Sequence, residues 1–188
     1  MIMITEIKQK MSFEEYLVYD DGTDNNYELE DGDLLLMNPP TGRHALIIRF
    51  LYNLLESEIK VLNNPWLTLQ NIGIRTSLKR SRIPDLAVIN REQIEEKLDV
   101  SAVIESPPIL VIEIVSPESI IRDYRYKRSE YSVVGIPEYW IVDPEAKRLT
   151  VLLLVEGLYE EIIYQENQKI VSNIFPALEV TVKDVLEG

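Results

Sequence analysis

The residues Ile109–Ser116, with the sequence ILVIEIVS, constrain the fold more than any other part of the chain. Because side chains alternate across a strand, Ile109, Val111, Glu113 and Val115 share one face, and the opposite face is apolar throughout. Two apolar faces are typical of a strand that is covered on both sides inside an α/β domain. Glu113 is the exception, because a buried carboxylate is costly unless it is paired, hydrogen-bonded or bound to a metal.

The pattern around this strand predicts a single α/β domain over residues 1–188, with a mixed central sheet flanked by helices and extra β-hairpins. Helices are expected after the N-caps Ser12, Thr41 and Ser116, the last with an inward stripe formed by Ile120, Tyr124, Lys127, Tyr131 and Val134. Strands are expected at 66–74, 83–89, 109–115 and 138–142, and hairpins at 27–37 and 149–164. A loop is expected at 75–82, a polar irregular segment or a short helix at 91–103, and a short strand with a helical turn at 175–186. The strand–helix–strand order from 109 to 142 predicts parallel strands with a right-handed crossover.

The composition of the chain excludes several kinds of catalytic and metal site. The chain has no cysteine and a single histidine, His44, so thiolate nucleophiles and Cys- or His-rich metal sites are excluded. It also lacks the glycine-rich loops that cradle nucleotides and the G-x-S-x-G elbow of serine hydrolases. No apolar run reaches membrane-spanning length, and residues 1–11 show no signal-peptide core, so a cytoplasmic protein with no membrane partner is expected.

The net charge of −13 argues against a general affinity for nucleic acid, but the charges are unevenly distributed. Nine acids and no base lie between residues 11 and 42. Two clusters are basic, and their members are Arg75, Lys79, Arg80 and Arg82 in the first and Arg122, Arg125, Lys127 and Arg128 in the second. The first cluster adjoins Asp85, so phosphate steering by its side chains, with His44 lining the same cleft, is one interpretation, and a solvated loop is the other.

After these exclusions, aspartate, glutamate and lysine side chains are the remaining candidates for a catalytic site. Asp85 lies near the start of the strand predicted over 83–89, Glu113 lies within the strand predicted over 109–115, and Lys127 falls on the apolar stripe of the following helix. Carboxylate oxygens suit Mg²⁺ or Mn²⁺, and two acids with a nearby lysine are the minimum apparatus for metal-assisted phosphodiester hydrolysis.

Six ordered blocks of this chain resemble the PD-(D/E)XK nuclease superfamily, and more closely its Uma-type family of small restriction-endonuclease-like proteins. The blocks are YELEDGDLLLMNPP (27–40), His44 opening a helix, RIPDLAVI (82–89), LVIEIVSPES (110–119), RDYRYKRSEY (122–131) and GIPEYWIVDP (135–144). The resemblance implies a restriction-endonuclease-like αβββαβ core and a metal-dependent endonuclease that cleaves DNA.

The resemblance also implies roles for particular residues. Asp85 and Glu113 correspond to metal ligands, with the main-chain carbonyl of Ile114 as a third. The superfamily motif has lysine two residues after the glutamate, where this chain has Val115. The Uma-type family carries the lysine on the next helix, which matches Lys127. An acid in the YELEDG block matches Glu28, a further candidate catalytic residue.

Each assignment has a structural alternative. Glu113 and Lys127 could form a buried ion pair without a metal, and Lys127 could instead bridge to Asp123 one turn earlier. Asp85 could be a turn residue, and Glu28 could be one of many solvated acids. His44 is more simply a helix-start residue than a cleft residue. The aromatic residues Tyr124, Tyr131, Tyr139 and Trp140 are better interpreted as core than as a base-stacking platform.

The sequence thus predicts a Mg²⁺- or Mn²⁺-dependent deoxyribonuclease, and cutting both strands of a duplex would favour a homodimer. A catalytically inactive nucleic-acid-binding or accessory protein with the same fold is the main alternative, which the acidic charge and Val115 favour. A metal-dependent hydrolase of small phosphoesters is a third possibility, distinguished by a weak dependence on salt.

Overall fold

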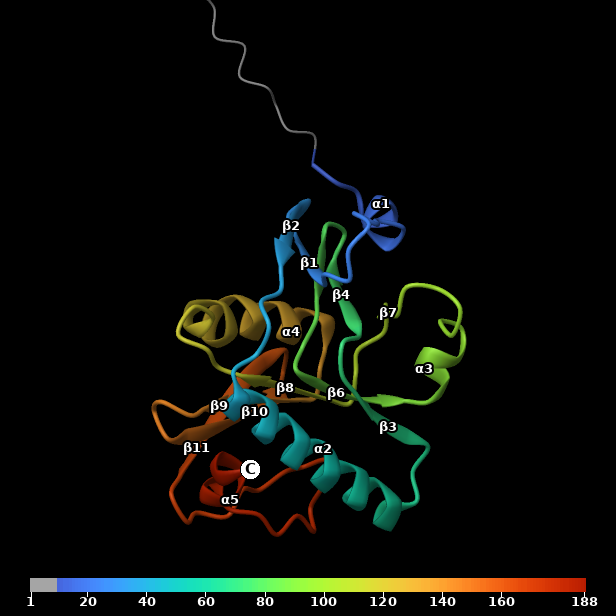
Figure 1. Cartoon of the computed structure of the whole chain (residues 1–188). Helices are drawn as coiled ribbons and strands as arrows, with labels where there is room; N and C mark the ends of the chain where they lie inside the picture. Colours follow the sequence, from blue (N-terminus) through green and yellow to red (C-terminus); the bar gives the residue numbers. More distant parts are fainter. Residues whose placement is uncertain (1–9) are drawn as a thin grey trace, which may run out of the picture.

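The computed structural model describes residues 10–188, so most of the segment that bears on a signal peptide lies outside the described residues. A six-stranded mixed sheet forms the centre, in the order β11-β10-β9-β8-β6-β3 (Figure 1). Its strands are β3 (Trp66–Leu69), β6 (Leu86–Asn90), β8 (Leu110–Ile114), β9 (Glu138–Asp143), β10 (Arg148–Val155) and β11 (Leu158–Gln165).

The predicted strand around Glu113 is confirmed as β8, in which all five residues are buried. It pairs in parallel with β9 and antiparallel with β6. The predicted strand–helix–strand unit is therefore confirmed, since β8 and β9 are neighbouring parallel strands. Together α2 (Gly42–Leu62), β3, β6, β8, the helical segment 122–134 and β9 follow the predicted order αβββαβ.

Helices cover both faces of this sheet. Figure 1 shows α2 and α5 (Val182–Glu187) on one face, and the segment formed by η1 (Arg122–Lys127) and α4 (Arg128–Val134) on the other. The apolar stripe predicted for α2 is confirmed, because Ile47, Leu51, Leu55 and Ile59 are all buried. Its predicted N-cap is also confirmed, since the Thr41 side chain accepts a hydrogen bond from a backbone N–H of the first turn.

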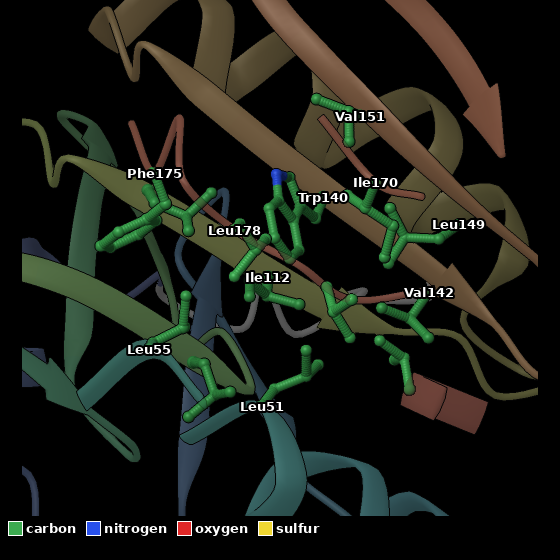
Figure 2. Packing of buried hydrophobic residues seen from close by; sticks show 14 of the residues in the cluster. Leu51, Leu55, Ile112, Trp140, Val142, Leu149, Val151, Ile170, Phe175 and Leu178 are labelled. Carbon is green, nitrogen blue, oxygen red and sulfur yellow. The ribbon is translucent and has the colours of Figure 1, made fainter. Parts of the chain in front are cut away.

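The side chains of β8 alternate between the two faces of the sheet and contribute to two separate apolar clusters. Leu110, Ile112 and Ile114 pack with α2 and α5 in a cluster that includes Trp140 and Phe175 (Figure 2). Val111 and Val115 face the other way and pack against a second cluster that contains Tyr131, Tyr139 and Ile141. Glu113 lies on this second face, beneath η1 and α4. The core prediction is therefore confirmed for Tyr131, Tyr139 and Trp140, whereas Tyr124 is only half-buried.

A second sheet, in the order β2-β1-β5-β4-β7, rises beside η1 and α4 (Figure 1). Its strands are β1 (Tyr27–Glu30), β2 (Asp33–Leu36), β4 (Gly73–Ser77), β5 (Arg80–Arg82) and β7 (Val103–Ile104), and short helices α1 (Phe13–Leu17) and α3 (Glu92–Glu95) flank it. The predicted hairpin over 27–37 is confirmed as β1 and β2, and its Asp31-Gly32 turn has positive φ at both residues, as a tight two-residue hairpin turn requires. The hairpin over 149–164 is confirmed as β10 and β11.

Three local predictions were wrong. The strand predicted over 66–74 is two strands of different sheets, separated by a turn in which Asn71 has positive φ. The basic segment 75–82 is a β-hairpin made by β4 and β5. The tail contributes only an isolated bridge between Lys169 and Thr181 before α5, with no further strand after Phe175.

The helix after β8 differs from the predicted regular α-helix, because residues 122–127 form a π-helix. Its wider turn changes which side chains face the sheet. Ile120, predicted to point inward, is 45% exposed, whereas Asp123 is buried beside Lys127. Within residues 10–188, no helix combines the length and the apolar character that crossing a membrane requires.

Candidate active site

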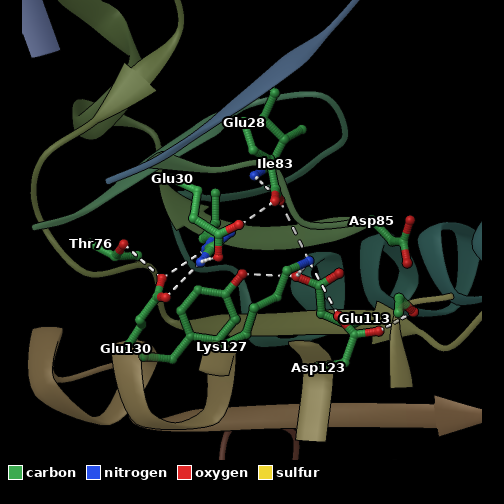
Figure 3. A network of polar contacts seen from close by, with 12 residues as sticks. Glu28, Glu30, Thr76, Ile83, Asp85, Glu113, Asp123, Lys127 and Glu130 are labelled. Carbon is green, nitrogen blue, oxygen red and sulfur yellow. Dashed lines mark hydrogen bonds and ion pairs between the residues drawn. The ribbon is translucent and has the colours of Figure 1, made fainter. Parts of the chain in front are cut away.

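Glu113 lies at the centre of a buried polar cluster (Figure 3). Its side chain is 5% exposed, and its Oε1 lies 2.8 Å from Lys127 Nζ. The hydroxyl of Tyr131 donates a hydrogen bond of 2.8 Å to the same oxygen. Burial raises the pKa of Glu113 to about 8, since the attraction of Lys127 only partly offsets burial and the repulsion from Asp123 and other nearby acids.

Lys127 joins three carboxylates. Besides Glu113, its Nζ lies 3.4 Å from Asp123 Oδ1 and 3.5 Å from Glu28 Oε1. Burial by itself would lower the pKa of Lys127, but these carboxylates outweigh it and raise the pKa above its ordinary value. Lys127 is therefore a cation held in place by acids from β1, β8 and η1. Both structural alternatives for this residue, the pair with Glu113 and the bridge to Asp123, are present together.

Asp85 lies at the end of β6, next to β8. The β6–β8 register pairs Leu86 with Ile112, so one further step brings Asp85 opposite Glu113. Its Oδ2 accepts a 2.6 Å hydrogen bond from the backbone N–H of Ile114, and its Oδ1 lies 2.8 Å from Nε2 of His44 at the start of α2. The two predicted metal ligands thus lie at the same end of neighbouring strands but are held by different partners. No contact assigns a role to the Ile114 carbonyl, which remains a predicted ligand.

Glu28 is fully buried in β1, so the alternative of a solvated acid is wrong. Its Oε1 accepts a 3.0 Å hydrogen bond from the backbone N–H of Ile83, and its Oε2 lies 3.2 Å from Nη1 of Arg82. Burial acts to raise the pKa of Glu28, but Lys127 and Arg82 outweigh it and lower the pKa. Glu28 therefore ties the second sheet to the cluster around Glu113.

The first basic cluster is largely occupied by acids. Arg82 is fully buried, and its guanidinium donates to Glu130 at 2.6 and 2.8 Å. Arg80 pairs with Asp31 and Arg75 with Glu105. The solvated-loop interpretation therefore fails for Arg82, which has no exposed surface to meet a phosphate. Lys79 is exposed, and phosphate steering by the members of this cluster other than Arg82 stays a prediction.

Asp123 is the site residue that sequence reasoning did not assign. It is buried, bonds to the Ser119 hydroxyl, and has its pKa raised chiefly by burial. The available signal was its position four residues before Lys127 in the same helical segment. That spacing indicates a contact with Lys127, and Asp123 is buried because it lies on the side of the helix that faces the sheet.

The donor set fits a hard divalent cation. Three acids, Glu28, Glu113 and Asp123, lie around Lys127, and Asp85 lies on the strand next to Glu113. Burial is the main cause of the raised pKa of Glu113, and the neighbouring acids add to it. Asp123 Oδ1 is buried and accepts no hydrogen bond from any residue in 10–188. Over that same range, no group of three or more acidic or histidine side chains forms a ready-made metal cage. Mg²⁺ commonly uses one or two carboxylates and retains several waters, so Asp85 and Glu113 suffice in number.

This chain is similar to proteins of a known family. The family model "Uma2", described as "Putative restriction endonuclease", matches residues 13–183. The chain belongs to the Uma2 family. The resemblance drawn from the six sequence blocks is thereby confirmed, and the family supports a nuclease that acts on nucleic acid.

A solved structure shares the fold of this Uma2 protein. It is a crystal structure of a "putative nuclease belonging to DUF820" from Anabaena variabilis, with a TM-score of 0.78 and 19% sequence identity. The alignment covers 94% of this chain and 98% of that chain, so the fold extends over nearly the whole of both. The search of curated proteins finds no match.

Proposed function

We propose that this Uma2 protein is a Mg²⁺- or Mn²⁺-dependent nuclease that hydrolyses phosphodiester bonds in DNA. The observation that carries the proposal is the arrangement around β8. Lys127 Nζ lies 2.8 Å from Glu113, and Asp85 is bound to the backbone N–H of the next residue, Ile114. Glu113 and Lys127 are therefore in contact, and Asp85 lies on the neighbouring strand at the same end of the sheet.

Each residue has a role in this proposal. Asp85 and Glu113 hold the divalent cation, assisted by the Ile114 carbonyl, and the bound cation would lower the pKa of water and stabilise phosphoryl charge. Lys127 orients the attacking water, and its position is maintained by Glu28 and Asp123. His44 fixes the orientation of the Asp85 carboxylate, as partners of metal ligands commonly do. We place the protein in the cytoplasm, with which the lack of cysteine is consistent.

A supercoiled-plasmid nicking assay with Mg²⁺, Mn²⁺ or EDTA tests the proposal. Asp85→Ala and Glu113→Ala are each expected to abolish metal-dependent nicking while far-UV circular dichroism stays unchanged. Glu160→Ala is the matched control, since Glu160 is an exposed glutamate on the edge strand β11. Full activity in either folded site variant would reject the assignment of that residue.

Two observations favour the alternative of a catalytically inactive nucleic-acid-binding or accessory protein. Glu113 is already contacted by a cation, Lys127, and the described residues contain no preformed cage of three ligands. Titration with Mn²⁺ separates the two functions, because the nuclease requires saturable binding that Glu113→Ala weakens. Nicking that falls steeply as salt rises would favour a polymeric substrate over a small phosphoester.

A further inference from the structure

Five of the ten arginines, Arg122 among them, form no ion pair within residues 10–188, but of these only Arg122 has a buried nitrogen without a hydrogen-bond partner there. Ion pairs bind the side chains of Arg75, Arg80, Arg82, Arg128 and Arg148. Within residues 10–188, no carboxylate lies within ion-pair distance of Arg122. Its Nε is buried and finds no hydrogen-bond acceptor among those residues. A buried donor without an acceptor is costly, and because the Arg122 side chain is only half-buried, its guanidinium can gain an acceptor from outside the chain by turning toward solvent.

The π-helix places Arg122 beside the candidate active site. In a π-helix, hydrogen bonds join residues five apart, which therefore lie close to the same side of the helix. Arg122 precedes Lys127 by five residues in η1, so the two side chains project in similar directions. The side chain of Arg122 is half-buried, whereas that of Arg125 in the same helix is exposed.

The positive charge of Arg122 acts on two of the acids in the candidate active site. Burial raises the pKa of Asp123 and opposes the lowered pKa of Glu28, and the Arg122 guanidinium acts in the lowering direction on both, although it contacts neither carboxylate directly. Arg122 thus lies near the acids, and its Nε–H forms no hydrogen bond with any residue in 10–188. A guanidinium presents several N–H donors in a planar fork that matches the oxygens of a phosphate group.

We propose that Arg122 binds a phosphate group of the nucleic-acid substrate at the edge of the cluster formed by Glu28, Glu113, Asp123 and Lys127. This inference rests on the proposed function and extends it by naming the residue that holds the backbone next to the acids. A chain with a net charge of −13 repels phosphates in general, so an unpaired arginine at this position supplies the local attraction that binding requires. Such a contact would not depend on base identity.

The test compares Arg122→Ala and Arg122→Lys with the matched control Arg125→Ala. The control removes the same charge from an exposed position in the same helix. Binding of a fluorescent 20-base-pair duplex is measured by anisotropy in Ca²⁺ and in EDTA at several salt concentrations. Mn²⁺ affinity is measured by calorimetry, plasmid nicking is measured in Mg²⁺, and circular dichroism verifies folding.

Arg122→Ala is expected to weaken duplex binding by roughly 10- to 100-fold, as for loss of a charged hydrogen bond. It is also expected to reduce the slope of log affinity against log salt by about one. Mn²⁺ affinity should be retained, Arg122→Lys should recover part of the binding, and Arg125→Ala should change affinity by less than about threefold, as expected for a screened surface charge.

Equal duplex affinities of folded Arg122→Ala and wild type would overturn the inference, as would equal losses in Arg122→Ala and Arg125→Ala. Absence of duplex binding by the wild type would overturn it as well. If Arg122→Ala does not fold, Arg122→Lys decides, since full wild-type affinity and an unchanged salt slope together would then argue against a fork-shaped phosphate contact.

The inference and the proposed function can fail separately. A wild-type protein that binds DNA through Arg122 without nicking it would refute the nuclease proposal alone, and nicking unaffected by Arg122→Ala would refute the inference alone.

Discussion

Replacing Glu113 by glutamine is expected to stabilise the metal-free protein, and the gain should grow as the pH rises. Burial raises the pKa of Glu113 from its ordinary value of 4.5 to about 8. Between these two values the folded protein retains a proton that the unfolded chain releases. Wild type therefore loses stability as the pH rises through this window, whereas the glutamine variant, which resembles protonated Glu113, does not.

The size of the effect follows from the pKa shift. At 1.36 kcal/mol per pKa unit, Glu113→Gln should gain about 2 kcal/mol at pH 6 and about 4 kcal/mol at pH 8. Below pH 4.5 both states of the wild type are protonated, so the two proteins should converge. The substitution does not leave Lys127 without an acidic partner, because Glu28 and Asp123 remain 3.5 and 3.4 Å from its Nζ.

Urea unfolding in EDTA over pH 5–8 measures the effect, with Glu160→Gln as a control that changes an exposed glutamate. An identical free energy of unfolding for wild type and Glu113→Gln at pH 8, or a loss in the variant, would refute the reasoning. It would mean that Lys127 keeps Glu113 ionised in the folded protein. Mg²⁺ should reduce the difference at pH 8, since a bound cation stabilises the ionised carboxylate.

Two further substitutions test the packing that supports the site. Arg82→Met should lower the free energy of unfolding by about 3–5 kcal/mol in urea titrations, because the glutamates that it contacts stay buried without their cation; an unchanged stability would contradict this account. Gly73→Ala should cost about 1–3 kcal/mol, since a Cβ there would lie 2.8 Å from Cγ2 of Val103. Gly42→Ala is its control, where a Cβ meets nothing within 4 Å, and equal effects of the two alanines would contradict the steric argument.

Patterns that act over short stretches of sequence predicted most of the fold. The period of apolar residues located α2, the Asp31-Gly32 turn located the first hairpin, and the two-sided apolar run located β8. The same run identified Glu113 as the residue that needed a partner. Lys127 was identified as a candidate partner, and the structure brings these two together at 2.8 Å.

The errors have a different origin, since they depend on contacts between distant residues. The basic segment around Arg82 looks like a solvated loop in isolation. Its strands form because Glu28 and Glu130, 54 and 48 residues away, supply buried counter-charges. Likewise, local periodicity assumes a regular α-helix, and this assumption placed Ile120 inward. No sequence signature of a π-helix is strong enough to predict how it rotates the side chains around the helix axis.

The position of Lys127 depends on the helical segment that follows β8. Val115, two residues after Glu113 on the same face of the strand, is 8% exposed and packs in the apolar cluster with Tyr131. A lysine at that position would have to displace this packing. Lys127 reaches Glu113 from the helix above, so its placement depends on how η1 and α4 pack against β8. Asp123 lies four residues before Lys127, a spacing that a regular α-helix also brings together, so the π-helical winding matters mainly for how Lys127 is directed toward Glu113 and Glu28.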